Sequence, residues 1–448
     1  MVCLSSCSPS APTLRTASEL QMETARRTKW RIATTVGEYE RVGHKDPKWD
    51  EDAKAALESF ALMDFKDAQE QSKDYKRAAN SAERAVQAGC DDPLIRYYYY
   101  MLAFNGEGHK TNEVIDASMK LAGDMTASGY AEIRKFYVCY RTAQWIQNWD
   151  RRMQQEVWNL RIQARDHLCA ALEDKELPSS EAQPACVEML QALGRYGNNE
   201  DEEAFKRIDG LLLKHFSRTS VPYYVKGLFY LDYAWKARGG GYANSVTPEG
   251  WKLYAERLAI AEPALVKAWQ MNPSEPSAAT EMIRLATDTS KSREEMELWF
   301  QRAMAANTNN WDACNHKMRY LYPQWHGSAE EMLAFGRECL TNQAWGGAVT
   351  LMIVDAHQAV AAYGGAGTNY WKRPEVWPEI RGAYEEYYRR NPGSELYHHN
   401  FAWYAWSYED WDTLNQQLAF LGEDDYFYFG GKRAFEEMAQ NARSHAHK

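Results

Sequence analysis

The chain has 448 residues, of which 45% are hydrophobic and 13% aromatic, with 17 Trp and 28 Tyr among them. This length suffices for two or three globular cores or for one elongated helical solenoid, and the apolar content argues against disorder over most of the chain. A formal net charge of -10 argues against nucleic acid as a partner, because the surface as a whole repels phosphate.

Residues 1–28 are expected to form a disordered segment. They include the stretch LSSC, Leu4 to Cys7, which is similar to the cleavage box of a bacterial lipoprotein and would make Cys7 the lipidated residue. A secretory signal needs an apolar stretch of about 7 to 15 residues upstream of that box, which the printed sequence lacks. Lipid anchoring therefore requires a true start upstream of Met1. As written, the sequence predicts a soluble protein with no transmembrane segment, in a compartment that it does not specify.

Residues 29–195 form a first predicted helical block, because apolar residues recur there at spacings of three and four. The basic cluster from Arg26 to Arg31 is interpreted as a solvated helix face. Further on, Asp46 and Pro47 have the spacing of a helix cap followed by the first helical residue. An acidic stretch rich in Asn and Gly ends this block.

Residues 204–440 form a second predicted helical block, and residues 441–448 a frayed tail. Thr247 with Pro248 marks one helix start in this block, and Ser328 with Glu331 can form a capping box at another. Two Gly-rich loops, 237–245 and 363–371, interrupt the helical pattern. Neither loop has the context of a phosphate-binding loop. No strand pattern is present, so an all-α fold is expected.

Small and apolar residues recur along the predicted helices at spacings of four and then three, which places each set on one helical stripe. The first helix of a unit shows an aromatic, small, aromatic spacing at Tyr223, Gly227 and Tyr230. A small residue there allows two antiparallel helices to pack closely. The stripes occur at Ala78, Ala82 and Ala85; Ala261, Leu265 and Ala268; Met296, Phe300 and Ala303; Ile380, Tyr384 and Tyr387; and Leu414, Leu418 and Leu421.

This pattern resembles the tetratricopeptide repeat. Three segments, VGEYERVGHKDPKWDEDAKAAL, ARGGGYANSVTPEGWKLYAERLA and YLYPQWHGSAEEMLAFGREC, are similar to segments of bacterial proteins of tetratricopeptide-like fold that carry a domain of unknown function. The resemblance implies an α-solenoid of stacked antiparallel helix pairs with irregular insertions, which would bind a protein or peptide. It implies no catalytic residues. About five units are recognisable, and their spacing is irregular.

Loops that interrupt such a solenoid can project aromatic side chains into its concave face. An aromatic ring beside Arg or Asn suits a peptide or a sugar, because the ring stacks while the polar neighbour fixes orientation. The alternative is that these rings fill the joints between irregular units. The candidate ligand-binding residues are Arg238, Tyr242, Asn244 and Trp251 in the first loop, Tyr370 and Trp371 with Asn369 and Arg373 in the second, and Trp325 and His326 in a short turn.

The favoured function is a non-enzymatic scaffold for an unidentified protein or peptide. The alternative is a carbohydrate-active enzyme on an α/α fold, with a Trp-lined cleft and two acids drawn from Glu249, Asp355 and Glu375. His357 lies on an apolar stretch and is expected to be a core residue. The eight cysteines contain no CxxC pair, so neither a metal site nor a cofactor is expected.

Overall fold

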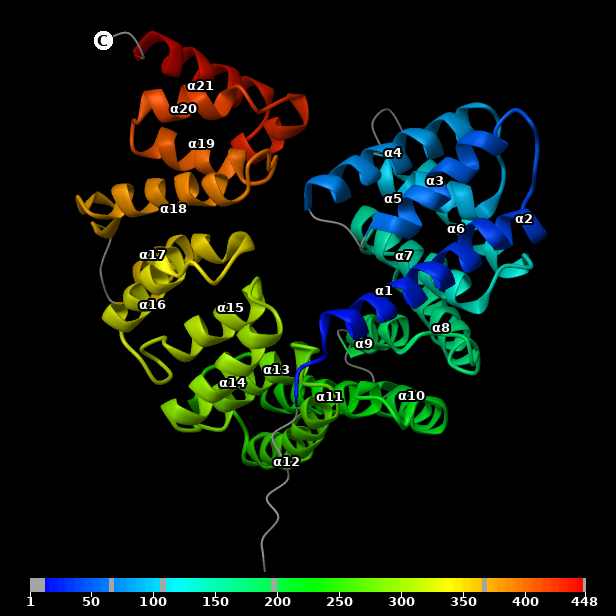
Figure 1. The fold of residues 1–448 in the computed structure, drawn as a ribbon, viewed down its shortest axis with the longest axis horizontal. Coiled ribbons are helices and arrows are strands. Elements are labelled where there is room, and N and C mark those ends of the chain that lie inside the picture. The colour runs from blue at the N-terminus through cyan, green and yellow to red at the C-terminus, as the bar shows by residue number, and fades with distance from the viewer. Residues whose placement is uncertain (1–12, 64–67, 105–109, 195–199, 365–368, 446–448) are drawn as a thin grey trace, which may run out of the picture. The chain divides into compact units, whose positions relative to one another are not determined.

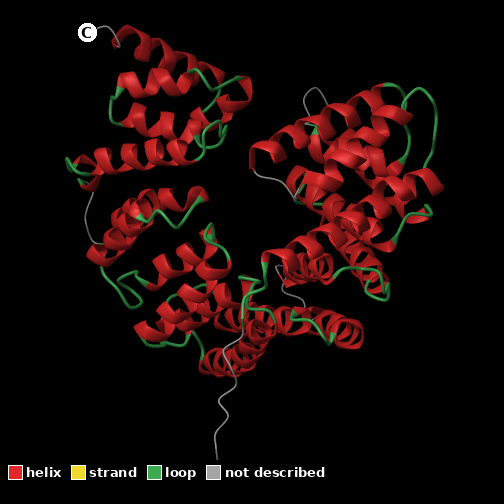
Figure 2. Cartoon of the chain, viewed as in Figure 1, coloured by secondary structure: helices red, strands yellow, loops and turns green. Residues whose placement is uncertain are grey.

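The computed structural model describes residues 13–63, 68–104, 110–194, 200–364 and 369–445. Throughout these ranges the chain consists of helices joined by loops, and none of their residues lies in a strand (Figure 2), which confirms the predicted all-α fold class. In the same ranges, no helix is both long enough and apolar enough to cross a membrane.

Contacts divide the chain into two compact units, Met1–Ala278 and Ala279–Lys448 (Figure 1). The first unit contains α1 (Ala17–Ile32), the π-helical turn η1 (Ala33–Gly37), α2 (Glu38–Val42), α3 (Asp50–Leu62), α4 (Ala68–Gln87), α5 (Pro93–Leu102), α6 (Thr111–Ala127), α7 (Glu132–Trp149), α8 (Gln154–Ala171), α9 (Ser179–Gly194), α10 (Glu200–Phe216), α11 (Val221–Arg238), the 3-10 turn η3 (Ala243–Ser245) and α12 (Pro248–Met271).

The second unit begins within α13 and runs to the end of the described chain. It contains α13 (Ser277–Asp288), α14 (Arg293–Ala306), α15 (Trp311–Tyr320), α16 (Ala329–Thr341), the 3-10 helix η4 (Gly347–Leu351), α17 (Met352–Tyr363), the 3-10 turn η5 (Tyr370–Lys372), α18 (Val376–Arg390), α19 (His398–Ser407), α20 (Trp411–Leu418), the 3-10 helix η6 (Glu423–Phe429) and α21 (Lys432–His445).

The helical part is longer than the sequence predicted at both ends. A capping box between Thr16 and Glu19 starts α1 at Ala17, well before the predicted end of the disordered segment at residue 28. At the other end, α21 continues to His445, into the predicted tail 441–448. Helix α9 packs against α10 and α11, so contacts span the segment between the predicted blocks 29–195 and 204–440. The compact units instead divide after α12.

Two arginines of the basic cluster hold α1 against α9, so the prediction of a fully solvated face is wrong for them. Arg27 and Arg31 both donate to Oε1 of Glu181, at 2.8 Å for Arg31. The Glu181 and Arg31 side chains are almost completely buried, with residue exposures of 3% and 9%. A buried carboxylate is stable when it is paired and hydrogen-bonded. These contacts therefore fix the N-terminal helix on the first unit.

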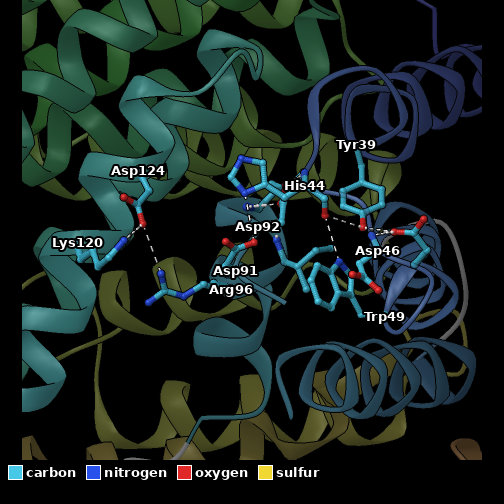
Figure 3. Close-up of polar contacts among 12 residues, drawn as sticks. Tyr39, His44, Asp46, Trp49, Asp91, Asp92, Arg96, Lys120 and Asp124 are labelled. Atoms are coloured by element: carbon cyan, nitrogen blue, oxygen red, sulfur yellow. Dashed lines mark hydrogen bonds and ion pairs between the residues drawn. The ribbon is translucent and has the colours of Figure 1, made fainter. Parts of the chain in front are cut away.

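A polar cluster fixes the turn between α2 and α3 (Figure 3). The carboxylate of Asp92, which is fully buried, accepts hydrogen bonds from the backbone N–H of His44 at 2.9 Å and from the Tyr130 hydroxyl at 2.9 Å. It also caps the first turn of α5. Tyr39 donates to Asp50 at 2.8 Å. One buried acid thus joins three segments, because its oxygens satisfy donors from each of them.

The predicted helix start at Asp46 and Pro47 is wrong by one turn. Pro47 lies in a turn, and α3 begins at Asp50. The Oδ1 atom of Asp50 accepts from the backbone N–H of Asp46 at 3.0 Å, so the acid just inside the helix closes the turn that precedes it. The predicted start at Thr247 and Pro248 is confirmed, with Thr247 accepting from the backbone N–H of Gly250 at 3.0 Å.

The predicted stripes face the protein interior. Their members are buried to 4% exposure or less, except Leu418 and Leu421, which are half-buried. Helices α11 and α12 form an antiparallel pair, because Gly227 faces Leu265, Tyr233 binds Arg257, and Ala237 lies beside Gly250. A Cβ atom at Gly227 would lie 2.6 Å from Cγ of Leu265. The small residue is therefore required by the close approach of the two helices.

In the second unit, α17, α18, α19, α20 and α21 pack successively against one another (Figure 1). The core between the last three helices is made of small and medium-sized side chains: Ala402, Ala405, Leu414, Met438 and Ala442. Helix α19 buries His398, Phe401 and Tyr404 together with its two alanines, and it leaves two Trp side chains exposed. This division positions the aromatic residues described next.

Candidate functional site

A pocket in the second unit is lined by aromatic side chains from η5, α18 and α19. Its volume is about 810 Å³. We name it the aromatic pocket; its lining residues are Gln358, Trp371, Lys372, Arg373, Pro374, Trp377, Pro378, Trp403, Tyr404, Ser407, Tyr408 and Glu409. Ligand sites are typically concave and mainly apolar, with a few polar groups that fix orientation. The aromatic pocket has this composition.

The rings of the aromatic pocket pack in three geometries. Trp377 and Tyr408 are stacked, with ring centroids 5.2 Å apart and planes at 16°. Trp403 and Tyr404 meet edge to face at 84°, and Trp371 is tilted by 40° relative to Tyr404. The rings therefore form walls that stand at angles to one another instead of one flat platform.

Helix α19 supplies three of the pocket residues because of its sequence, HHNFAWYAWS. Ala402 and Ala405 face the core, and Tyr404 is also buried. Trp403 and Trp406, three residues apart, therefore lie on the opposite side, with 47% and 42% of their surface exposed. Exposed Trp side chains with this spacing are costly in water and are typical of binding surfaces.

The orientation of Trp371 is set by its neighbour Tyr370. The Tyr370 side chain is 1% exposed, and its hydroxyl lies 2.7 Å from Nδ1 of the fully buried His357. Glu379 approaches His357 from the other side, with Oε2 3.2 Å from Nε2, and is bound by Arg337 at 2.8 Å. With Tyr370 held in the interior, Trp371 is directed into the aromatic pocket.

Burial makes the His357 and Tyr370 pair neutral. It lowers the pKa of His357 and raises the pKa of Tyr370 to about 12. A neutral imidazole and a neutral phenol can share one hydrogen bond in the interior without the cost of burying a charge. The pair therefore anchors η5 while both groups are neutral.

Four polar side chains of the aromatic pocket already have partners within the chain. Gln358 donates to the Tyr404 hydroxyl at 2.7 Å, and the indole N–H of Trp377 donates to Asp410 at 3.1 Å. Burial raises the pKa of Asp410, but hydrogen bonds from Thr413, Trp377 and Arg381 outweigh it and hold the pKa below its usual value. Ser407 donates to the backbone oxygen of Trp403 at 2.8 Å.

Two kinds of group remain available at the aromatic pocket. Within the described chain, the indole N–H groups of Trp371 and Trp403 have no hydrogen-bond partner. Lys372 and Arg373 are exposed at the edge of the pocket and form no ion pair with any described residue. The guanidinium of Arg373 instead lies 4.9 Å from the ring centre of Tyr370. The pocket thus offers stacking surfaces, indole donors and positive charge.

The residues predicted in the first Gly-rich loop lie together in the first unit. The Arg238 guanidinium lies over the rings of Trp235 and Trp251, at 4.9 and 5.2 Å, and donates to two carbonyl oxygens of the loop itself. Arg238 therefore stabilises the loop. Tyr242 is 89% exposed, and Asn244 is exposed beside it. Whether these two side chains bind a ligand stays a prediction.

The other predicted residues lie in the second unit and have different environments. His326 packs on Tyr320, with ring centroids 4.4 Å apart, and approaches the backbone oxygen of Thr287 at 3.3 Å. Trp325 contacts the guanidinium of Arg319. This turn fills a joint between helices. Tyr370 is buried, which corrects the expectation of an exposed ring.

Of the predicted residues, Trp371 and Arg373 line the aromatic pocket. Sequence reasoning missed Trp377, Trp403, Tyr404 and Tyr408, although the density of aromatic residues in FAWYAWSYEDW was a signal. The Trp and Tyr residues three and four positions apart on the same helix would have indicated a second, aromatic face.

The three acids of the predicted enzyme alternative do not line the aromatic pocket. Glu249 is exposed in the first turn of α12, in the first unit. Asp355 lies on α17, and Glu375 precedes α18, in the second unit. Glu409 is the one carboxylate among the lining residues. In the described ranges, no three His, Cys, Asp or Glu side chains lie together as metal ligands would.

The described cysteines are buried and unpaired: Cys90, Cys139, Cys169, Cys186, Cys314 and Cys339. The predicted role of Cys139 and Cys169 as small buried hydrophobic residues is confirmed. Burial raises the pKa of both thiols, so neither is an activated nucleophile. The predicted lipidation residue Cys7 lies outside the described residues.

A second cavity, between α9 and α11 in the first unit, has a volume of about 300 Å³. Its lining combines aliphatic side chains and the rings of Phe229 and Tyr233 with the polar side chains of Gln191, Asp232 and Lys236. The aromatic pocket is larger and contains unused donors, so it is the better candidate site.

A comparison with models of known protein families found no match for the chain, and a search of curated proteins found no match either. The geometry of the aromatic pocket and the packing of the helices are therefore the observations that bear on the function.

Proposed function

We propose that the chain is a non-enzymatic binding module of tetratricopeptide-like helix pairs, and that its aromatic pocket holds a peptide segment of a protein partner. The observation that carries this proposal is the lining of the pocket. Rings from three helical segments surround about 810 Å³ next to two basic side chains without ion-pair partners in the described chain. Aromatic residues and Arg are the residue types that contribute most at protein interfaces.

The packing of the helices supports the repeat interpretation. The α11–α12 pair is antiparallel, with Gly227 at its closest approach, as the aromatic, small, aromatic spacing predicts. In the second unit each helix from α17 to α21 packs on the next. In helical repeat proteins, neighbouring units bury a continuous core and leave one surface for binding.

The carboxylates favour binding over hydrolysis at this pocket. Glycosidases that use paired acids need two carboxyl groups about 5 to 9.5 Å apart. The aromatic pocket contributes Glu409, and Asp410 next to it is held by Trp377, Arg381 and Thr413. An acid bound in this way is already charge-compensated, so it is poorly suited to protonate a leaving group.

A phage-displayed library of random peptides, selected on the full chain, tests the proposal. We expect the selected peptides to lose binding to a Trp371→Ala/Trp403→Ala variant, because both indoles line the pocket. A matched control is Trp149→Ala, which removes a 39% exposed Trp from α7 in the first unit and should leave binding unchanged. Selected peptides that bind the pocket variant as well as the wild type would contradict the proposal.

The enzyme alternative has its own readout. Incubation of the chain with a panel of oligosaccharides should release no new reducing ends. Release that depends on Trp371 and Trp403 would replace the binding module with a carbohydrate-active enzyme.

A further inference from the structure

The occupant of the aromatic pocket can be narrowed by its backbone conformation. Added β-strands bind at the edge of a sheet, and no described residue of this chain lies in a strand. A helical ligand satisfies its own carbonyl groups, so it would leave the indole donors of Trp371 and Trp403 unused. A polyproline II segment has no internal hydrogen bonds, and its carbonyl groups are free to accept from these donors.

The arrangement of the rings favours the same conformation. Trp403 and Tyr404 meet at 84°, and Trp371 is tilted by 40° from Tyr404. Angled walls of this kind hold the compact ring of a proline between them, and proline-rich segments are typically recognised in aromatic-lined grooves. A sugar ring would instead need one flat face and several directional hydrogen bonds. Two of the side chains that could make such bonds, Gln358 and Ser407, already donate within the chain.

The charges at the edge of the pocket indicate which residues accompany the proline. Lys372 and Arg373 are exposed there without an ion-pair partner in the described part of the chain, whereas the chain as a whole carries a net charge of -10. Glu409 is the one acid of the lining. A carboxylate on the ligand is therefore attracted to the η5 edge and repelled near Glu409.

From these three observations we infer that the aromatic pocket recognises an extended, proline-containing peptide that carries acidic residues next to its prolines. The pyrrolidine rings pack among Trp371, Trp377 and Trp403. The indole N–H groups of Trp371 and Trp403 donate to carbonyl oxygens of the peptide, and its carboxylates pair with Lys372 and Arg373. This inference rests on the proposed function and names the class of peptide that the pocket takes.

Fluorescence anisotropy on the full chain tests it. The probe is a fluorescein-labelled peptide of about twelve residues, mainly proline with glutamate at every third position, which spans about 37 Å in the polyproline II conformation. One comparison peptide has alanine in place of each proline, and a second has lysine in place of each glutamate. We expect the proline–glutamate peptide to bind at least tenfold more tightly than either comparison peptide.

Variants separate the two parts of the recognition. Trp403→Ala should weaken the proline–glutamate peptide at least tenfold, and Trp149→Ala should not. Lys372→Glu/Arg373→Glu should weaken binding of the proline–glutamate peptide and strengthen binding of the proline–lysine peptide, because the charge at the edge of the pocket changes from positive to negative. Circular dichroism of each variant checks that the helices remain intact.

The failures of the inference and of the proposed function are distinguishable. Peptides selected from the random library could bind through Trp371 and Trp403 while the proline–glutamate peptide binds no better than its alanine counterpart. In that case the inference is wrong and the proposed function stands. If neither kind of peptide responds to the pocket variants, both are wrong. Saturable binding of an oligosaccharide, abolished by Trp403→Ala, in place of any peptide would likewise overturn both.

Discussion

Burial raises the pKa of Asp355 to about 6, because most of its neighbours on α17 are apolar. The folded state therefore binds a proton more tightly than the unfolded chain does, where an Asp titrates near its usual value of about 3.9. Between these two values the folded chain carries more protons. The free energy of unfolding should accordingly fall as the pH rises from about 4 to about 6.

An Asp355→Asn variant should remove this loss, because the amide is neutral at every pH. We expect the variant to be more stable than the wild type by about 1 to 3 kcal/mol at about pH 7.5, with little difference at about pH 4. Urea unfolding followed by circular dichroism at the two pH values measures the effect. Equal gains at both values would show that the charge of Asp355 is not the cause.

The sequence does not show which of the adjacent residues Tyr370 and Trp371 is buried and which lines the aromatic pocket. Both are aromatic and follow the same Gly-rich loop, so the sequence gives them equal standing as ligand-binding residues. They lie in the 3-10 turn η5, where successive side chains are about 120° apart. One therefore faces the interior and His357, and the other faces the aromatic pocket. The choice depends on His357, a partner that local pattern cannot reveal.

At the scale of helices, the contact between α11 and α12 depends on Gly227. A Gly227→Ala variant would gain helix propensity but would place a Cβ atom 2.6 Å from Leu265 Cγ and 3.2 Å from its backbone nitrogen. We expect a net destabilisation of about 1 to 2 kcal/mol, because the overpacked helices must separate. Thermal and urea unfolding measure it.

Gly210 provides the matched control. It also lies inside a helix, α10, but no heavy atom outside that helix would come within 4 Å of an added Cβ atom. Gly210→Ala should therefore stabilise the chain by about 0.5 to 1 kcal/mol through helix propensity alone. If both substitutions stabilise equally, the close approach of α11 and α12 is not real.

The docking of α1 on α9 should depend on the buried side chain of Glu181. A Glu181→Ala variant removes the buried carboxylate that accepts from Arg31, and we expect a loss of about 2 to 4 kcal/mol in the free energy of unfolding. Amide hydrogen exchange in residues 17–32 should accelerate. Glu437→Ala, which breaks an exposed pair with Arg433, should cause no measurable change. Unchanged exchange in α1 of the Glu181 variant would contradict the assigned contact.

Local signals located some helix starts correctly and left others misplaced. The start of α12 follows from Thr247 and Pro248, because a cap and an N1 proline act within one turn. The start of α3 was misplaced because Asp50 closes a turn that also binds Tyr39 and lies beside the Asp92 cluster. The beginning of α1 was missed although Thr16 and Glu19 form a local capping box there, so this boundary is an exception to the pattern.

For the whole molecule, the sequence was sufficient for the fold class but not for the site. Helical spacing and the absence of strand patterns predicted an all-α chain, and the buried stripes agree with it. The aromatic pocket combines residues of α17, η5, α18 and α19 and of the stretches that follow η5 and α19, and its walls form only when α18 and α19 pack together. Sequence pattern identified one wall, Trp371, and the edge residue Arg373. The remaining walls depend on tertiary packing, which no local periodicity encodes.

We propose above all that the chain holds its ligand in the aromatic pocket of the second unit. Fluorine NMR of the full chain with all 17 Trp replaced by fluorotryptophan tests it most directly, with signals assigned by single Trp→Phe variants. On addition of the proline–glutamate peptide, we expect the signals of Trp371, Trp377 and Trp403 to shift and that of Trp149 to stay in place. Shifts confined to other tryptophans would contradict binding at the aromatic pocket, and the absence of any shift at high peptide concentration would overturn the preference for the proline–glutamate peptide.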